Sequence, residues 1–103
     1  MVVSVEAVTS EVCLSGRLDV HTVHDVRAVL HAALEQGTGD LVVNVRDLEM
    51  LDVTGLGMLV GVHRRAGRSG RRLVLREVGP QLDRMLRVSR LHRILAVEAG
   101  TPV

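Results

Sequence analysis

The sequence of 103 residues contains no phenylalanine, tyrosine or tryptophan. This absence argues against functions that stack bases or sugars on aromatic rings, and it requires a core of aliphatic side chains. Cys13 is the single cysteine, so no internal disulfide can form. The apolar runs are far shorter than the roughly 20 residues of a membrane-spanning helix, and the first residues lack a secretory signal pattern. We therefore expect a protein of the reducing cytoplasm.

Lysine is also absent, because all 13 basic residues are arginines. The charges are unevenly distributed: residues 1–63 carry three arginines and nine acidic residues, whereas residues 64–103 carry ten arginines and three acidic residues. Such polarity can orient an approaching partner, or the two halves can pair internally in the folded domain. Internal pairing is the simpler interpretation.

The composition predicts one domain over residues 1–103. A hydrophobic content of 47% is enough for a core without a stabilising disulfide or metal, and neither a linker nor an internal repeat divides the chain.

The first half of the chain predicts a hairpin, a helix and a buried strand. Apolar residues alternate on both sides of a polar break at residues 9–11, which indicates two short strands over residues 2–18. Thr22 and Asp25 resemble a capping box, and the apolar spacing after them predicts an amphipathic helix that ends near Gly37 and Gly39. Residues 41–45 are apolar and largely β-branched, as in a strand that is buried on both faces.

The second half predicts two further strand and helix pairs. A connection over residues 46–51 leads to a helix that begins after Asp52 and ends near Gly70. A strand at 73–75, a helix that starts at Gly79 and Pro80, and a last short strand at 95–98 complete the pattern. The predicted fold class is α/β, with a mixed sheet that opens with a hairpin and is covered by about four helices.

The sequence gives little support for an enzyme, a metal site or a nucleotide site. Histidines 21, 24 and 31 and Asp25 are scattered as solvated helix residues usually are. The spacing Gly55-x-Gly57-x-x-x-Gly61 is one residue off the dinucleotide fingerprint. No spacing implies a nucleophile with its base. We expect no catalytic residue, cofactor or metal in this chain.

An arginine-rich segment offers a competing function, namely nucleic-acid binding through phosphates. Residues 63–68 contain three arginines and a histidine, and Arg71 and Arg72 follow closely. Against this function stand the formal net charge of +1, the missing aromatic residues and the lack of a helix-turn-helix pattern. The alternative is the solvated end of a helix.

The segment from Asn44 to Gly57 carries the most specific signal. With its ending Asp52-Val53-Thr54-Gly55-Leu56-Gly57, it resembles the signature of the bacterial STAS family of anti-sigma factor antagonists. The pattern Leu14-Ser15-Gly16-Arg17-Leu18-Asp19 resembles that family's strand end, and the segments 70–75 and 82–95 resemble its fourth strand and third helix. The resemblance covers nearly the whole chain.

The resemblance implies a phosphorylation site. The family's typical pattern is Asp-Ser-Ser-Gly-Leu-Gly, and a partner kinase that is also the anti-sigma factor phosphorylates the second serine. Thr54 occupies that position, while Val53 replaces the first serine. Independently of the family, Thr54 lies between a strand end and a helix start, where free N–H groups and the helix dipole favour an anion. The alternative is that Thr54 or Asp52 is an ordinary helix N-cap.

The same resemblance implies a partner-binding surface. Its predicted residues are Asp19, Asp52, Val53, Gly55, Leu56, Gly57 and Leu59. Asp19 can equally be a turn residue before the first helix, and Leu56 can equally anchor its own helix. Gly55 and Gly57 lack a Cβ and so permit another backbone to approach. Asn44 is expected to support the motif loop through hydrogen bonds.

Two hypotheses follow from the resemblance. In the first, the unphosphorylated domain binds a serine/threonine-kinase-type anti-sigma factor and frees a sigma factor, phosphorylation of Thr54 ends the interaction, and a phosphatase restores it. The kinase would hold the nucleotide and Mg²⁺. In the second, the chain is a STAS scaffold subunit of a signalling complex, in which Thr54 is only a helix cap.

Overall fold

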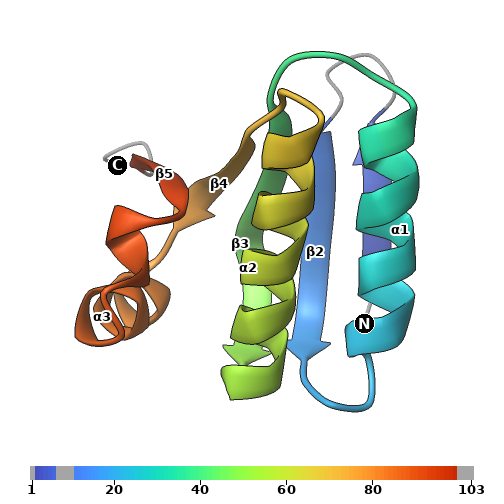
Figure 1. The fold of residues 1–103 in the computed structure, drawn as a ribbon. Helices are drawn as coiled ribbons and strands as arrows, with labels where there is room; N and C mark the ends of the chain where they lie inside the picture. The colour runs from blue at the N-terminus through green and yellow to red at the C-terminus, as the bar shows by residue number, and fades with distance from the viewer. Residues whose placement is uncertain (1, 7–10, 100–103) are drawn as a thin grey trace.

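A computed structural model describes residues 2–6 and 11–99 of the chain. The elements follow one another as a hairpin and then as alternating helices and strands (Figure 1). They are β1 (Val2–Glu6), β2 (Glu11–Leu18), α1 (Val23–Glu35), β3 (Leu41–Leu51), α2 (Val53–Arg68), β4 (Leu73–Val78), α3 (Pro80–Val88), the 3₁₀ helix η1 (Leu91–Arg93) and β5 (Ala96–Ala99). The predicted mixed α/β fold is confirmed, although three α-helices and one 3₁₀ turn are described where about four helices were predicted.

The described strands form one sheet in the order β1-β2-β3-β4-β5. β1 pairs antiparallel with β2, from Val2 opposite Ser15 to Glu6 opposite Glu11, and this pairing confirms the predicted hairpin. β2, β3, β4 and β5 are parallel to one another. The carboxyl ends of β2 and β3 therefore lie at the same edge of the sheet, next to the first turns of α1 and α2 (Figure 1).

Strand β3 is longer than the sequence pattern predicts. The predicted connection over residues 46–51 is wrong, because these residues continue the strand to Leu51. β2 supplies the pairing partners, with Ser15 opposite Asp47 and Leu18 opposite Leu51. Two register shifts along this pairing break the regular alternation of buried and exposed residues. The sequence of residues 46–51 therefore lacks the alternating pattern of a strand and resembles a loop.

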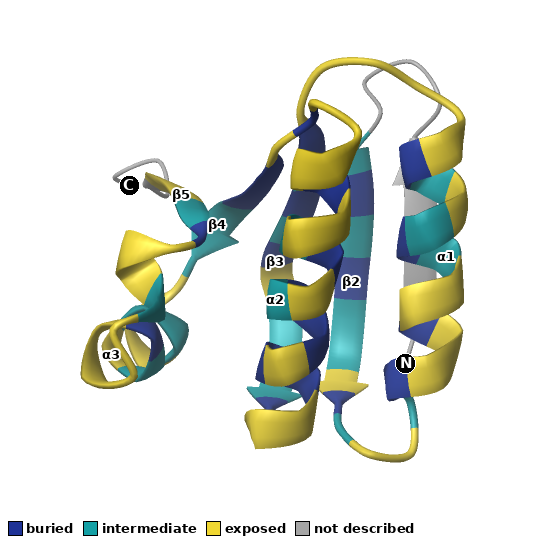
Figure 2. Cartoon of the chain, viewed as in Figure 1, coloured by how far each residue is buried: buried dark blue, intermediate teal, exposed yellow. Residues whose placement is uncertain are grey.

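Helices α1 and α2 lie side by side on one face of the sheet and bury their apolar sides against it (Figures 1 and 2). The core of the described chain is formed by Val, Leu, Met and Ala side chains. Its fully buried large side chains are Leu14, Leu18, Leu30, Leu41, Leu59, Leu73, Leu75, Leu86, Val12, Val26, Val43 and Val62. Within the described helices, none is long and apolar enough to cross a membrane.

The first helix starts differently from its predicted capping box. Thr22 holds the N-cap position of α1, but its side chain makes no cap hydrogen bond. Its hydroxyl instead donates to the Arg17 carbonyl at 2.9 Å and accepts from the Asp19 N–H at 3.0 Å. The hydroxyl therefore closes the β2–α1 turn and does not cap the helix.

Candidate functional site

The predicted site lies where β3 ends and α2 begins. Asp52 is the N-cap residue of α2, and its carboxylate accepts a hydrogen bond from the Gly55 N–H at 2.9 Å. The Asp52 N–H donates to the Leu18 carbonyl at 3.2 Å, which ties the start of α2 to the end of β2. Asp52 therefore fixes the helix start, so the alternative of an ordinary N-cap is confirmed for Asp52 and is wrong for Thr54.

The next two residues face the solvent. Val53 is 83% exposed, the largest value among the exposed large hydrophobic residues of the described chain. Thr54 is exposed too, and its hydroxyl makes no hydrogen bond to any described residue. The first N–H groups of a helix lack intrahelical acceptors. Because Asp52 occupies the Gly55 N–H, those of Val53 and Thr54 are left for an anion.

Gly55 supports the site from within. A Cβ at this position would lie 2.8 Å from the Leu18 Cγ, the Leu18 carbonyl oxygen and the Leu51 Cδ1. The close backbone approach expected at Gly55 is therefore real, but it joins α2 to β2 inside the protein. Gly57 differs, because it is exposed and a Cβ there would meet nothing within 4 Å.

Two predicted partner-binding leucines are core residues. Leu56 is 6% exposed and Leu59 is fully buried, so neither side chain is available to a partner. Their prediction as contact residues is wrong, because the helix turns both toward the sheet while Val53, Thr54 and Gly57 lie on its outer side. The burial of Leu56 agrees with its alternative, that it anchors its own helix.

Asp19 lies near the start of α2, since it follows Leu18 directly. Its carboxylate accepts from the His21 N–H at 2.9 Å and lies 3.8 Å from the Arg17 guanidinium, and its side chain is only 14% exposed. These contacts are those of a turn residue that shapes the β2–α1 loop.

Asn44 makes its side-chain hydrogen bonds away from the start of α2. Its side chain donates to Glu11 at 2.9 Å and accepts from the Arg46 N–H at 2.9 Å, and it forms no contact with Asp52. Glu11 also pairs with Arg76 at 3.4 Å. Asn44 therefore belongs to a polar network across the middle of the sheet. At about 3.3 Å per residue, it lies far along β3 from the helix start.

The arginine-rich segment 63–72 does not form one basic surface. Arg71 is buried, and its guanidinium donates to the carbonyls of Gly39, Leu34 and Ala33 at 2.8, 2.7 and 3.2 Å. Arg72 pairs with Asp40 at 2.9 Å. The structure thus assigns Arg71 to the end of α1 and the loop after it. Sequence reasoning missed this contact, since no local pattern marks an arginine that caps a distant helix.

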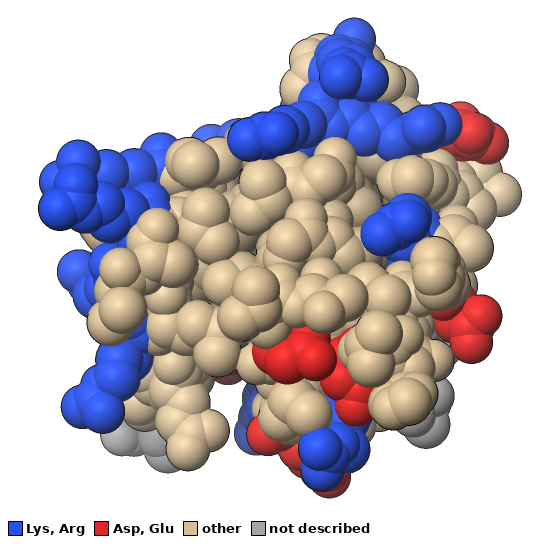
Figure 3. Space-filling view, turned by 60° about the horizontal axis from the view of Figure 1, so that its bottom comes forward, with Lys and Arg blue, Asp and Glu red and all other residues tan. Residues whose placement is uncertain are grey.

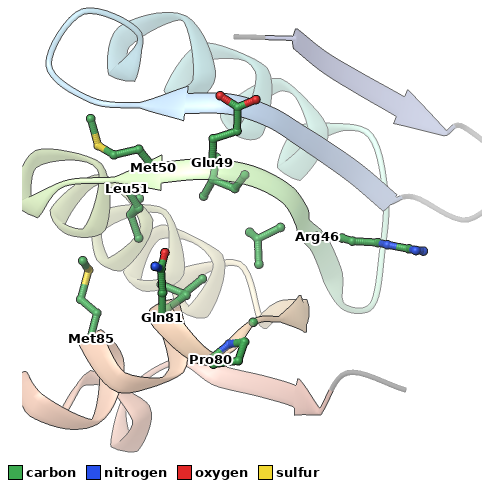
Figure 4. Close-up of a pocket in the computed structure, with 11 residues that line it drawn as sticks. Arg46, Glu49, Met50, Leu51, Pro80, Gln81 and Met85 are labelled. Carbon is green, nitrogen blue, oxygen red and sulfur yellow. The ribbon is translucent and has the colours of Figure 1, made fainter. Parts of the chain in front are cut away.

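Away from the predicted site, a hollow of about 500 Å³ lies between the end of β3 and the start of α3 (Figure 4). Leu51, Pro80 and Met85 line it, while Arg46 extends away from it. Its one acidic lining residue is Glu49, whose carboxylate points away from Pro80 and Gln81 in Figure 4, and its lining includes no histidine, serine or cysteine. Among the described residues, no three histidine, cysteine or acidic side chains are grouped as metal ligands.

Comparison with known proteins identifies the family. The family model described as Mlab, STAS domain, matches residues 1–97, and the chain belongs to the STAS family. The anti-sigma-B factor antagonist of Staphylococcus aureus is 32% identical over 93 residues, which cover 90% of this chain and 86% of the relative. That of Staphylococcus epidermidis matches to the same extent.

Solved structures agree with this assignment. An anti-sigma factor antagonist from Mycobacterium paratuberculosis has the same fold, with a TM-score of 0.81 at 20% identity over 93% of this chain and 83% of that one. The Bacillus cell fate determinant SpoIIAA in its phosphorylated form gives a TM-score of 0.74 at 26% identity over 97% and 92% of the two chains.

Proposed function

We propose that this protein is an anti-sigma factor antagonist whose binding to a kinase-type anti-sigma factor is ended by phosphorylation of Thr54. One observation carries the proposal. The exposed Thr54 hydroxyl, free of hydrogen bonds to the described residues, lies on the first turn of a helix that Asp52 already caps. Modification of Thr54 therefore costs the fold no cap and no buried contact. The names of the relatives support the antagonist function.

The phosphoryl transfer needs only an accessible hydroxyl from this chain. The Thr54 hydroxyl loses its proton and gains the γ-phosphoryl group of ATP, and ADP leaves, while the partner kinase holds the nucleotide. The product carries about −1.5 to −2 charges at neutral pH. The helix dipole and the N–H groups of Val53 and Thr54 stabilise that charge locally. An acidic partner surface would be repelled by it, and an apolar partner surface would have to desolvate it. The switch acts at the surface and leaves the core unchanged.

The contact surface that we propose consists of Asp52, Val53, Thr54 and Gly57. Around this end of the molecule, Figure 3 shows a broad uncharged surface with basic side chains along its upper and left margins and acidic ones below. Asp19, Gly55, Leu56 and Leu59 hold this surface in place from the loop and the core beneath it. The partner would thus contact few side chains, on a rigid support.

The phosphorylation is tested by intact-mass measurement after incubation with the cognate kinase-type anti-sigma factor and ATP. The wild-type chain is expected to gain the mass of one phosphate, and Thr54→Ala none. Thr38→Ala serves as the matched control, because Thr38 is another exposed threonine but lies in the α1–β3 loop. A wild-type chain whose mass does not change would rule out the switch and leave the scaffold function.

The exposed Val53 side chain gives a separate binding prediction. Truncation in Val53→Ala removes apolar area that the complex would bury, so we expect affinity for the anti-sigma factor to fall about five- to tenfold, or about 1 kcal/mol. Stability should change by less than about 0.5 kcal/mol, as is usual for an exposed position. Calorimetric titration measures the affinity.

Val88→Ala is the control for this substitution, because Val88 is 79% exposed at the end of α3 and does not belong to the proposed surface. It should leave the affinity unchanged. Equal effects of the two substitutions would place the interface elsewhere.

A further inference from the structure

A groove of about 530 Å³ runs between α1 and α2, on the side of these helices that faces away from the sheet. Arg27 and His31 line it from α1, and Arg64, Arg65 and Arg68 line it from α2. Thr54 lies at one end. At 1.5 Å per residue, the stretch of α2 from Thr54 to Arg68 is about 21 Å long. The groove therefore joins the proposed phosphorylation site to a row of cations.

The positive charge of this groove is largely uncompensated. Arg65 pairs with Glu35 at 3.6 Å, but no described carboxylate lies within ion-pair distance of Arg27, Arg64 or Arg68. Internal pairing of the two oppositely charged halves is thus incomplete at this face. Basic side chains also crowd the surface over α1 and α2, at the top of Figure 3.

The pKa of His31 reflects its burial first and the same positive field second. Burial lowers the pKa of His31 below 6.5, and the Arg65 and Arg27 guanidinium groups lower it further, while Glu35 opposes them. A lowered pKa means that the imidazole is neutral at pH 7. A bound negative charge would act in the opposite direction and raise this pKa.

The floor of the groove is open to close contact. Gly57 and Gly61 lie in it, and a Cβ at either position would meet nothing within 4 Å. The backbone of α2 is therefore accessible between the arginines. A long, open groove of this kind suits a segment of polypeptide. It suits a nucleic acid less well, because the chain has no aromatic side chain on which a base could stack.

We propose that this groove binds an acidic segment of the protein partner. The inference rests on the proposed function in one respect, namely that the partner is the protein bound at the start of α2, with which the groove is continuous at Thr54. It also extends the switch. A phosphate on Thr54 would place negative charge at the end of the groove that the acidic segment occupies, and it would repel the part of that segment that lies nearest to Thr54.

The test uses a fluorescein-labelled glutamate-rich peptide as a probe and measures fluorescence anisotropy at low ionic strength. The variant Arg27→Gln/Arg64→Gln/Arg68→Gln is expected to bind the peptide about tenfold more weakly than the wild type. The control variant Arg46→Gln/Arg84→Gln/Arg93→Gln loses the same charge from exposed arginines outside the groove. It should retain the affinity within about twofold.

Proton NMR of His31 gives a second readout. The imidazole pKa should rise when the peptide saturates the protein, and His21, which is exposed and lies outside the groove, serves as the reference. An unchanged His31 titration would place the peptide elsewhere.

Three other results would overturn the proposal: no peptide binding, equal loss of affinity in both variants, or tighter binding of a single-stranded oligonucleotide than of the peptide. None of these measurements requires the kinase. If the chain binds the peptide in the groove but takes up no phosphate, the groove proposal stands and the phosphorylation proposal fails. The two proposals can therefore fail separately.

Discussion

Replacing Arg71 with alanine is expected to lower the free energy of unfolding by about 2–4 kcal/mol, because it leaves buried or partly buried carbonyl groups without donors. The Arg71 guanidinium donates to two of them, on Leu34 and Gly39, and also to the Ala33 carbonyl, which keeps a hydrogen bond from the Gln36 N–H. These carbonyls belong to the last turn of α1 and the loop that leads to β3. Urea denaturation followed by far-UV circular dichroism measures the change.

Arg72→Ala is the matched control for this prediction. The neighbouring arginine is exposed and forms an ion pair with Asp40, also exposed, at 2.9 Å. Exposed pairs contribute about 0–1 kcal/mol, so the control should remain close to the wild type. Equal destabilisation by the two substitutions would contradict the role assigned to Arg71. A difference would also explain why this arginine-rich stretch cannot present all its charges to a nucleic acid.

Gly55→Ala is expected to destabilise the protein by about 1–3 kcal/mol, as overpacking usually does. The added methyl would lie 2.8 Å from the Leu18 carbonyl oxygen, a backbone atom that cannot rotate away, and equally close to carbons of Leu18 and Leu51. The start of α2 must then move from β2, which strains the hydrogen bond from the Asp52 N–H to Leu18. For a domain of this size, Tm falls by roughly 4–8 °C per kcal/mol. Differential scanning calorimetry measures this shift.

Gly57→Ala, two residues further along the same helix, should have the opposite effect. It adds its methyl to open space and gains helix propensity, which raises stability by about 0.5–1 kcal/mol. Two variants that shift Tm in the same direction would contradict the packing described for Gly55. Gly57 lies on the proposed contact surface, whereas Gly55 lies beneath it. The two variants therefore also distinguish a residue that supports the site from a residue that contacts the partner.

Local patterns in the sequence determined much of this protein. Alternating apolar residues predicted the hairpin, helical spacing predicted α1 and α2, and Gly79 with Pro80 marked the start of α3. The place of Asp52 and Thr54 between a strand and a helix could also be predicted, because their order along the chain is enough to define it. Such signals are short-range, and the backbone expresses them wherever the segment lies.

Only the tertiary structure decided which residues of the motif meet the solvent. Val53 and Thr54 are exposed while Gly55, Leu56 and Leu59 are buried, because the end of β2 packs against one side of the α2 start. Tertiary contacts also make Arg71 and Arg72 differ: Arg71 donates to carbonyls at the end of α1, whereas Arg72 beside it forms an exposed ion pair with Asp40. The tertiary structure also places Arg27 and His31 opposite Arg64 and Arg68, since only the packing of α1 on α2 brings those cations into one groove. Long-range pairing depends on contacts between segments, and no local pattern encodes it.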